Sequence, residues 1–464
     1  MNMTGNEKNK YEKYKRIYRM FSAILVVAAE SLLYWKVWFD YYNERTMNPF
    51  AQKGNFVMLL LYVFLLVVFI NFYGGVKIGY EKTTSMVFSQ GLAVICANIF
   101  VYLIIVLLTR GFPDFLPFAV LTLTDIVGIG IFMFILNRIY RTLFPARTLL
   151  MIYEDYESNA RLLARKMETR DDKYKIGEFI RGDEPMEVLQ EKIRNSEGVV
   201  LCEVHSKRRN KIIKYCYGAC IRVYVTPNIS DIILRGSENL HFFDTPLLLA
   251  RNSGLSIEQK LIKRCMDLVI SSLGIILASP FMLFTAIAIK LYDRGPVFFR
   301  QARVTNGGKI FYITKFRSMI VDAEKDGRVI PATERDPRIT PVGRVIRATR
   351  LDELPQLFDI FVGNMSIVGP RPERVEHVEK YTQEIPEFAY RLKVKGGLTG
   401  YAQIYGKYNT TAYDKLKLDL MYIENYSILL DIRLILLTIK IMFTRESTEG
   451  FTEEKSAEMR NAGK

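Results

Sequence analysis

The stretch "CMDLVISSLGIILASPFMLFTAIAIK", residues 265–290, decides on which side of a membrane the second half of the chain lies. It is apolar over a length that could span a bilayer, which takes about 20 residues, but Pro280 falls near its centre. Proline removes one helix hydrogen bond and clashes with the carbonyl four residues earlier, so we expect the helix to bend there. The hydroxyl of Ser279 can satisfy a freed carbonyl, which makes this break tolerable in lipid.

Basic residues flank both ends of this stretch, with Lys263 and Arg264 before it and Lys290 and Arg294 after it. Because positively charged residues favour the cytoplasmic side, we predict a re-entrant helix, at about 265–290, that enters and leaves through one face. The alternative is a kinked fifth spanning helix. That helix would carry everything after residue 290 to the outside of the cell.

Four earlier apolar runs are each long enough to cross a bilayer. They cover residues 21–42, 56–76, 86–109 and 115–139. Lysines and arginines collect before the first run, between the second and third, and after the fourth, so the positive-inside rule places both ends of this bundle in the cytoplasm. We therefore predict a four-helix transmembrane domain over residues 1–145.

Short strands alternate with helices in the next segment. The strand-like runs cover residues 148–153, 175–180, 198–204 and 221–226. This alternation predicts a small parallel sheet in a Rossmann-like α/β domain, residues 146–252. The turn after the first strand, "YEDYESN" at 153–159, is acidic and lacks the glycines of a dinucleotide-binding turn. We predict that the domain is degenerate and has a structural, regulatory or dimer-forming role.

The 464-residue chain carries a net charge of +15, which suits anionic lipid or phosphorylated substrates. A nucleic-acid partner is not expected, because the chain has membrane spans and no recognisable nucleic-acid-binding motif. The stretch "RATRLDELPQLFDIFVGNMSIVGPRPE", residues 347–373, places the adjacent acids Asp352 and Glu353 among several arginines. Many cations around one acid pair predict a phosphate-handling site, since arginine binds phosphate through two hydrogen bonds.

Residues 255–443 resemble the monotopic phosphoglycosyl transferases of the bacterial sugar transferase family. The motifs that carry the resemblance are the "SP" break, "KFRSM" (315–319), "TRLDELPQL" (349–357), "GNMSIVGPRPE" (363–373) and "GLTGYAQ" (397–403). With the four spans and the α/β domain in front, the chain is similar to the large branch of the family. This branch contains the polyprenyl-phosphate hexose-1-phosphate transferases that start capsule, exopolysaccharide or O-antigen assembly. The resemblance implies a mainly α catalytic domain over residues 253–445.

The resemblance also implies a reaction, in which a UDP-sugar donates its sugar-1-phosphate to undecaprenyl phosphate and releases UMP. Asp352 would attack the donor phosphorus and form a covalent phospho-sugar intermediate, because an acyl phosphate is itself a good phosphoryl donor. Glu353 would hold Mg²⁺. Arg347 and Arg371 would contact phosphate. We expect the surrounding arginines to lower the pKa values of both carboxyl groups and to keep them ionised.

Roles are also expected for other residues near the acid pair. Lys315 and Arg317 of "KFRSM" are expected to be further phosphate contacts, whereas Gln356 is close enough either to assist or simply to pack. His377 lies in a charged helical stretch and is expected to be solvated. The last apolar run, residues 426–445, is interrupted by charges, which favours an amphipathic helix lying in the membrane surface.

The sugar stays open, because Gly396, Gly397 and Lys407 depart from the family pattern in a region expected to shape the sugar-nucleotide pocket. Glucose or galactose is the expected sugar, and an N-acetylated sugar is the alternative. We expect a multi-pass protein of the bacterial inner membrane, with the catalytic domain on the cytoplasmic face, a homodimer through the middle domain, and a disordered tail at 446–464.

Two other functions remain open on the sequence. A membrane-anchored sugar-nucleotide dehydratase or epimerase would need a glycine-rich cofactor turn, which is missing after the first strand of the α/β domain. A non-enzymatic scaffold for glycan assembly would keep its function after loss of Asp352. Only the transferase accounts together for the acid pair, the bent helix, the cations and the spans.

Overall fold

The computed structural model describes residues 12–75, 78–250, 254–321, 323, 336–406 and 410–442. Lys407 and the predicted tail at 446–464 lie outside these residues. The chain packs as two units, Met1–Thr226 and Pro227–Lys464, which are described one at a time.

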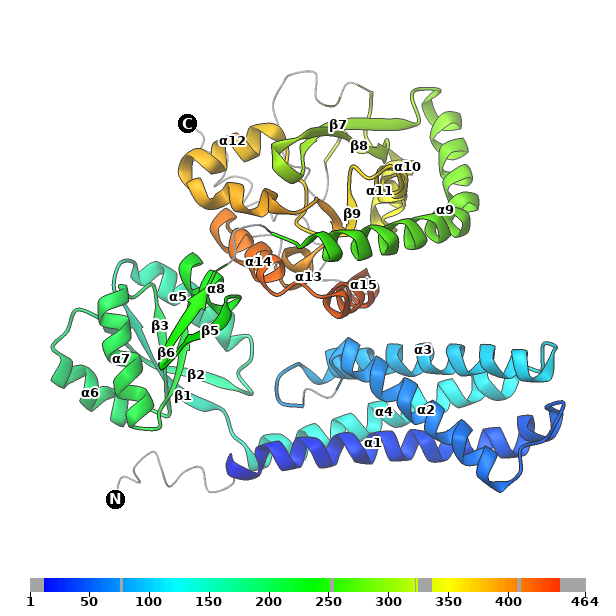
Figure 1. Ribbon diagram of the computed structural model, residues 1–464, viewed down its shortest axis with the longest axis horizontal. Helices are drawn as coiled ribbons and strands as arrows, with labels where there is room; N and C mark the ends of the chain where they lie inside the picture. Colours follow the sequence, from blue (N-terminus) through cyan, green and yellow to red (C-terminus); the bar gives the residue numbers. More distant parts are fainter. Residues whose placement is uncertain are drawn as a thin grey trace. The chain divides into compact units, whose positions relative to one another are not determined.

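The first unit begins with four long helices that pack against one another (Figure 1). They are α1 (Lys15–Val37), α2 (Gln52–Tyr73), α3 (Thr83–Thr109) and α4 (Leu116–Leu143). The first helix continues through a π-helical turn, Trp38–Tyr42. All four are long and apolar enough to cross a membrane, and many of their large apolar side chains are exposed. The chain is therefore a membrane protein, as predicted.

An α/β segment follows the helices in the first unit. Its strands are β1 (Arg147–Tyr153), β2 (Tyr174–Arg181), β3 (Gly198–Cys202) and β4 (Arg222–Val225). The helices between them are α5 (Glu157–Glu168), α6 (Met186–Arg194) and α7 (Ser206–Gly218). All strand pairs are parallel, in the order β2-β1-β3-β4, and two apolar clusters cover opposite faces of the sheet. The predicted parallel sheet is confirmed.

The second unit starts with elements that the sequence patterns do not predict. A short helix, α8 (Ile229–Arg235), is followed by a hairpin of β5 (Glu238–Phe242) and β6 (Thr245–Leu249). Ile229 and Ile232 of α8 are buried in the core of the second unit, where α8 contacts α14 (Ala412–Glu424).

The remaining elements of the second unit surround two small sheets. The strands are β7 (Phe298–Val304) and β8 (Ile310–Phe316), which form an antiparallel hairpin, and β9 (Ser366–Val368) and β10 (Gly397–Thr399), which pair in parallel. The helices are α9 (Ile257–Asp293), α10 (Pro341–Ala348), α11 (Gln356–Val362), α12 (Val375–Glu384), α13 (Tyr401–Tyr405), α14 and α15 (Ile428–Met442).

The long helix α9 bends sharply, so that its two stretches run in different directions (Figure 1). A straight helix of its 37 residues would be about 55 Å long, yet both ends contact the same unit. Near one end, Asp267 accepts a hydrogen bond from the Ile367 amide at 2.9 Å. At the other end, Asp293 pairs with Arg317. Ser279 Oγ donates to the Ile276 carbonyl at 2.8 Å, which confirms the expected compensation for the proline.

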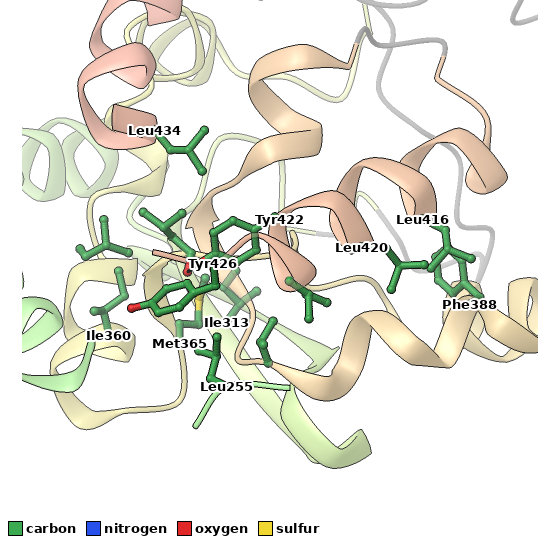
Figure 2. Packing of buried hydrophobic residues seen from close by; sticks show 14 of the residues in the cluster. Leu255, Ile313, Ile360, Met365, Phe388, Leu416, Leu420, Tyr422, Tyr426 and Leu434 are labelled. Carbon is green, nitrogen blue, oxygen red and sulfur yellow. Dashed lines mark hydrogen bonds between the residues drawn. The ribbon is translucent and has the colours of Figure 1, made fainter. Parts of the chain in front are cut away.

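One large apolar core supports the second unit. Figure 2 shows Tyr422 and Tyr426 grouped with Ile313, Ile360 and Met365. These residues come from β8, α11, α14 and the segments beside them, and so the core joins parts of the chain that are far apart in the sequence. The segment between α10 and β9, which carries the acid pair, is fixed on this core.

The last helix, α15, buries two of its charged residues against the protein, whereas a helix lying in the membrane surface would expose them to solvent. Asp431 is completely buried and accepts hydrogen bonds from Lys263 Nζ at 2.6 Å and from the Tyr422 hydroxyl at 2.8 Å. Lys440 is also buried, whereas Leu429 is exposed. Asp431 and Lys440 therefore help to anchor α15 to the protein together with the buried Leu434 and Leu437, whereas Leu429 and Met442 are exposed.

Candidate active site

The acid pair lies in a tight turn between α10 and α11. Thr340 caps α10 by accepting a hydrogen bond from the Gly343 amide at 2.8 Å. After this helix, Arg350 takes a left-handed backbone conformation (φ 57°), which costs about 1–3 kcal/mol in a residue other than glycine. A single 3-10 turn, Leu351–Glu353, follows directly, and α11 begins after Pro355. The turn places both acids at one end of α10.

Glu353 is held by cations from other elements. Its Oε1 accepts hydrogen bonds from Lys315 Nζ of β8 at 2.8 Å and from Arg371 Nη2 at 3.0 Å. Arg350 Nη1 lies 3.9 Å from Oε2. Burial opposes ionisation of this carboxyl group, but Lys315 and Arg371 outweigh it and hold the pKa of Glu353 far below its usual range. Glu353 is thus a fixed anion.

Asp352 is in a different state from its neighbour. It is partly buried, and its carboxylate accepts no hydrogen bond from any of the residues that the structure describes. Burial and the charge of Glu353 raise its pKa, and these effects exceed the opposing effects of Lys315, Arg347 and Arg350. The expectation that the arginines lower both pKa values is right for Glu353 and wrong for Asp352, because the nearest cations are paired with Glu353.

The other predicted phosphate contacts divide into two groups. Arg347 lies in the last turn of α10, close enough for its charge to act on Asp352. Together with Lys315 and Arg371 it surrounds the acid pair. Arg317 is directed elsewhere, because its guanidinium is buried and paired with Asp293 at the end of α9. Arg347, Lys315 and Arg371 therefore lie around the two acids. Arg317 instead forms an ion pair that holds the end of α9.

Comparison with known proteins gives the family of this unit. Residues 258–445 match the family model described as bacterial sugar transferase. A UDP-glucose:undecaprenyl-phosphate glucose-1-phosphate transferase from Caulobacter vibrioides is 39% identical over 191 residues, which are 40% of this chain and 71% of that protein. The chain belongs to the bacterial sugar transferase family.

Two further relatives are named for transfer of different sugars. An enzyme from Klebsiella pneumoniae, also named UDP-glucose:undecaprenyl-phosphate glucose-1-phosphate transferase, is 39% identical over 244 residues, 52% of each chain. An Aeromonas hydrophila protein named UDP-N-acetylgalactosamine-undecaprenyl-phosphate N-acetylgalactosaminephosphotransferase is 44% identical over 186 residues, 39% of this chain and 44% of that protein. The chain thus spans about half the length of these two relatives.

A buried ionic network lies behind Arg371. Arg391 Nη2 donates to the Arg371 carbonyl at 2.8 Å, and Arg391 Nε donates to Asp419 Oδ2 at 2.9 Å. Lys415 Nζ lies 2.6 Å from Glu373 Oε1, and Arg391 Nη1 lies 3.7 Å from the same atom. Sequence reasoning missed this network, since its members are separated by up to 46 positions and share no spacing.

Close backbone contacts also fix Arg371. A Cβ atom on Gly397 would lie 2.1 Å from the Gly369 amide nitrogen, and one on Gly400 would lie 2.1 Å from the Gly369 carbonyl oxygen. The segment with the departures at Gly396 and Gly397 therefore packs directly under the "GPRP" turn. These glycines are needed for close approach of two backbones.

Two other predicted residues are placed by the structure. Gln356 is buried at the start of α11, and its Nε2 has no hydrogen-bond partner in the described part of the chain. His377 is partly exposed on α12, with Nδ1 3.9 Å from Glu373 Oε2. His377 therefore lies beside the buried carboxyl group of Glu373, and its hydrogen bond helps to lower the pKa of that group.

The donor atoms at the acid pair suit Mg²⁺ only together with a phosphorylated substrate. No group of three or more acidic, histidine or cysteine side chains that could hold a metal occurs in the described ranges. However, Mg²⁺ commonly uses one or two carboxylates together with substrate phosphates. Glu353 Oε2 and the Asp352 carboxylate accept no hydrogen bond from described residues and are such donors.

Proposed function

We propose that this chain is an undecaprenyl-phosphate sugar-1-phosphate transferase. It moves hexose-1-phosphate from a UDP-sugar to undecaprenyl phosphate and releases UMP. The observation that carries the proposal is the difference between two adjacent acids: cations fix Glu353, whereas the neighbouring Asp352 carboxylate has free lone pairs. The names of the relatives support the same donor and acceptor classes.

Asp352 is the nucleophile of the proposed mechanism. Its oxygen forms a bond to the β-phosphorus of the donor as the bond between that phosphorus and the UMP oxygen breaks. The product is a phospho-sugar acyl phosphate on Asp352. An oxygen of undecaprenyl phosphate then attacks the same phosphorus, and the Asp352 carboxylate leaves. Glu353 is the poorer nucleophile in this proposal, because Lys315 and Arg371 hold its Oε1 and its Oε2 is assigned to Mg²⁺.

Cations around the acid pair would stabilise the charge of the transferring group. Arg347, Lys315 and Arg371 come from three different elements, so their positions are set by the fold before substrate arrives. Such charge stabilisation is the main contribution of a protein to phosphoryl transfer. Glu353 would hold Mg²⁺, which when bound neutralises the diphosphate and the departing UMP.

The membrane arrangement follows from α9 and the charge pattern. We infer that α9 re-enters the cytoplasmic face, since both its ends contact the same unit and its bend exposes Ile276, Leu277 and Phe281. The basic clusters near the spans support a position of the catalytic unit on the cytoplasmic side of the bacterial inner membrane. There the acid pair meets both a soluble UDP-sugar and a lipid phosphate, and the reaction starts the synthesis of a surface polysaccharide. We further propose that two copies of the chain assemble as a homodimer through the α/β domain.

Transfer assays with a panel of donors test the function. UDP-glucose, UDP-galactose and their N-acetylated counterparts would each be incubated with undecaprenyl phosphate, Mg²⁺ and the full chain. We expect one donor to give UMP and lipid-linked sugar phosphate, Asp352→Asn to lose this activity, and the exposed control Asp183→Asn to keep it. Full activity of Asp352→Asn would reject the proposed nucleophile. Conversion of the sugar without UMP release would favour the dehydratase or epimerase.

A further inference from the structure

The membrane helices of the first unit contain a buried polar layer that the transferase reaction does not use. Glu30 of α1 and Asp125 of α4 are 3% and 1% exposed. None of their four carboxylate oxygens has a hydrogen-bond partner among the residues described. Burying an acid without a partner is expensive, and such residues within membrane spans usually mark a functional site.

Two tyrosines are directed into the same layer. Tyr34 and Tyr62 are both fully buried, and their rings stack with centroids 4.1 Å apart. Neither hydroxyl finds a partner within the described part of the chain. Glu30 and Asp125 both lie close enough to Tyr62 for their charges to act on it, and Asp125 lies close enough to act on Glu30. The four side chains therefore form one cluster.

All four helices contribute to this layer at a similar depth. Tyr62 of α2, Asn98 of α3 and Asp125 of α4 each lie roughly three turns from one end of their helix, and the connections put those three ends on one side of the bundle. Asn98 is adjacent to Asp125, and its Oδ1 is also without a partner in the described residues. The layer thus contains several buried oxygen atoms that have no hydrogen-bond partner among the described residues.

We propose that α1–α4 enclose a binding site for one monovalent metal cation, formed by the Glu30 and Asp125 carboxylates and the Tyr34 and Tyr62 hydroxyls. All of these donors are hard oxygens, which excludes metals that prefer nitrogen or sulfur. Mg²⁺ keeps several waters and needs near-ideal octahedral geometry, and the described residues supply no third acid. A monovalent ion needs one net negative charge, which leaves the second acid able to hold a proton.

Direct binding of ²²Na⁺ to the full chain in lipid nanodiscs tests the site. Choline chloride would keep the ionic strength constant, and K⁺, Mg²⁺ and Ca²⁺ would be the competitors. We expect saturable binding of about one ion per chain that K⁺ displaces and that Glu30→Gln and Asp125→Asn abolish. Asp40→Asn is the matched control, because Asp40 is an exposed acid at the end of the same first membrane helix, and it should bind as the wild type does.

Tyr62→Phe keeps the test decisive if the acid variants fold poorly. Removing the hydroxyl should weaken ²²Na⁺ binding at least several-fold if the oxygen is a ligand. If the layer holds only a shared proton, wild type will show no saturable ²²Na⁺ binding. In that case Tyr62→Phe will raise the melting temperature or leave it unchanged, because it removes a buried hydroxyl without a partner. That result would overturn the proposal, as would displacement of ²²Na⁺ by divalent ions alone.

Discussion

At the scale of single residues, two adjacent acids of the site have different surroundings. Glu353 binds cations contributed by β8 and the "GPRP" turn, and Asp352 is left without hydrogen bonds from described residues. The pKa values of the two groups move in opposite directions. In the proposed mechanism, this arrangement makes Glu353 necessary for activity, whereas Asp352 is the nucleophile.

Glu353→Gln should therefore lower kcat/KM by about 10²–10³-fold, a loss typical of removing one preorganised electrostatic contact. The amide has the same shape but no charge to hold Lys315 and Arg371 beside Asp352. Steady-state UMP release measures the effect. Glu191→Gln, an exposed change in α6 of the first unit, should show no loss. Activity within threefold of wild type would contradict the role given to Glu353.

Arg391 is expected to act as a positioning residue for Arg371. Arg391→Lys keeps the charge, but one ammonium group cannot hold both the Arg371 carbonyl and Asp419 in the same geometry. We predict a higher KM for the UDP-sugar, with a smaller change in kcat. Initial rates at varied donor concentration measure the split. A uniform loss of active protein, with KM unchanged, would show that Arg391 only maintains stability.

The stability contributed by Glu373 should depend on pH. Burial opposes its ionisation, but His377, Lys415 and Arg391 outweigh it and hold the pKa of Glu373 well below its usual value. A carboxyl group with a lowered folded-state pKa contributes its full stability above the unfolded pKa of about 4.3. We predict that Glu373→Gln lowers the melting temperature most at pH 7, and that the difference from wild type shrinks below about pH 4.3. A difference that grows with acidity would have the wrong sign.

At the scale of elements, one buried ion pair fastens the membrane helix to the catalytic unit. Lys263 of α9 pairs with Asp431 of α15 at 2.6 Å, and both side chains are nearly inaccessible. Breaking a buried pair leaves an uncompensated charge and costs about 3–5 kcal/mol. Lys263→Met should therefore destabilise the protein strongly in thermal unfolding, whereas Lys260→Met on the exposed side of α9 should not.

The double variant Lys263→Met, Asp431→Leu gives the matching control. Replacing both partners by apolar residues is often neutral or stabilising, so much of the lost melting temperature should return. If the double variant is as unstable as the two single losses added together, the pair does not act as a unit.

At the scale of the whole molecule, the proposed re-entrant path of α9 would determine on which side of the membrane the reaction takes place. Single cysteines at Lys260 and Tyr292, in a background without the five native cysteines, report on the two ends of α9. Both positions are exposed. We predict that an impermeant thiol reagent labels both only from the cytoplasmic side. Labelling of position 292 from the opposite side alone would mean that α9 spans the membrane.

Local rules predicted a large part of this architecture. Apolar length predicted α1–α4, alternation predicted the parallel sheet, and Pro280 predicted the bend, because each depends on residues close together in the sequence. The packing of α8 against α14, the pairing of Arg317 with Asp293 and the network of Arg391 all depend on distant partners. The direction of the pKa change at Asp352 was also beyond the sequence, since it depends on burial.

The most direct test of the central claim is a search for the covalent intermediate. The full chain would be incubated with its UDP-sugar and Mg²⁺ without undecaprenyl phosphate, and then digested for peptide mass spectrometry. We predict a burst of about one UMP per active site and a hexose-phosphate on Asp352 that disappears when undecaprenyl phosphate is added. Normal turnover with no burst and no modified peptide, or a modification on another residue, would contradict the account.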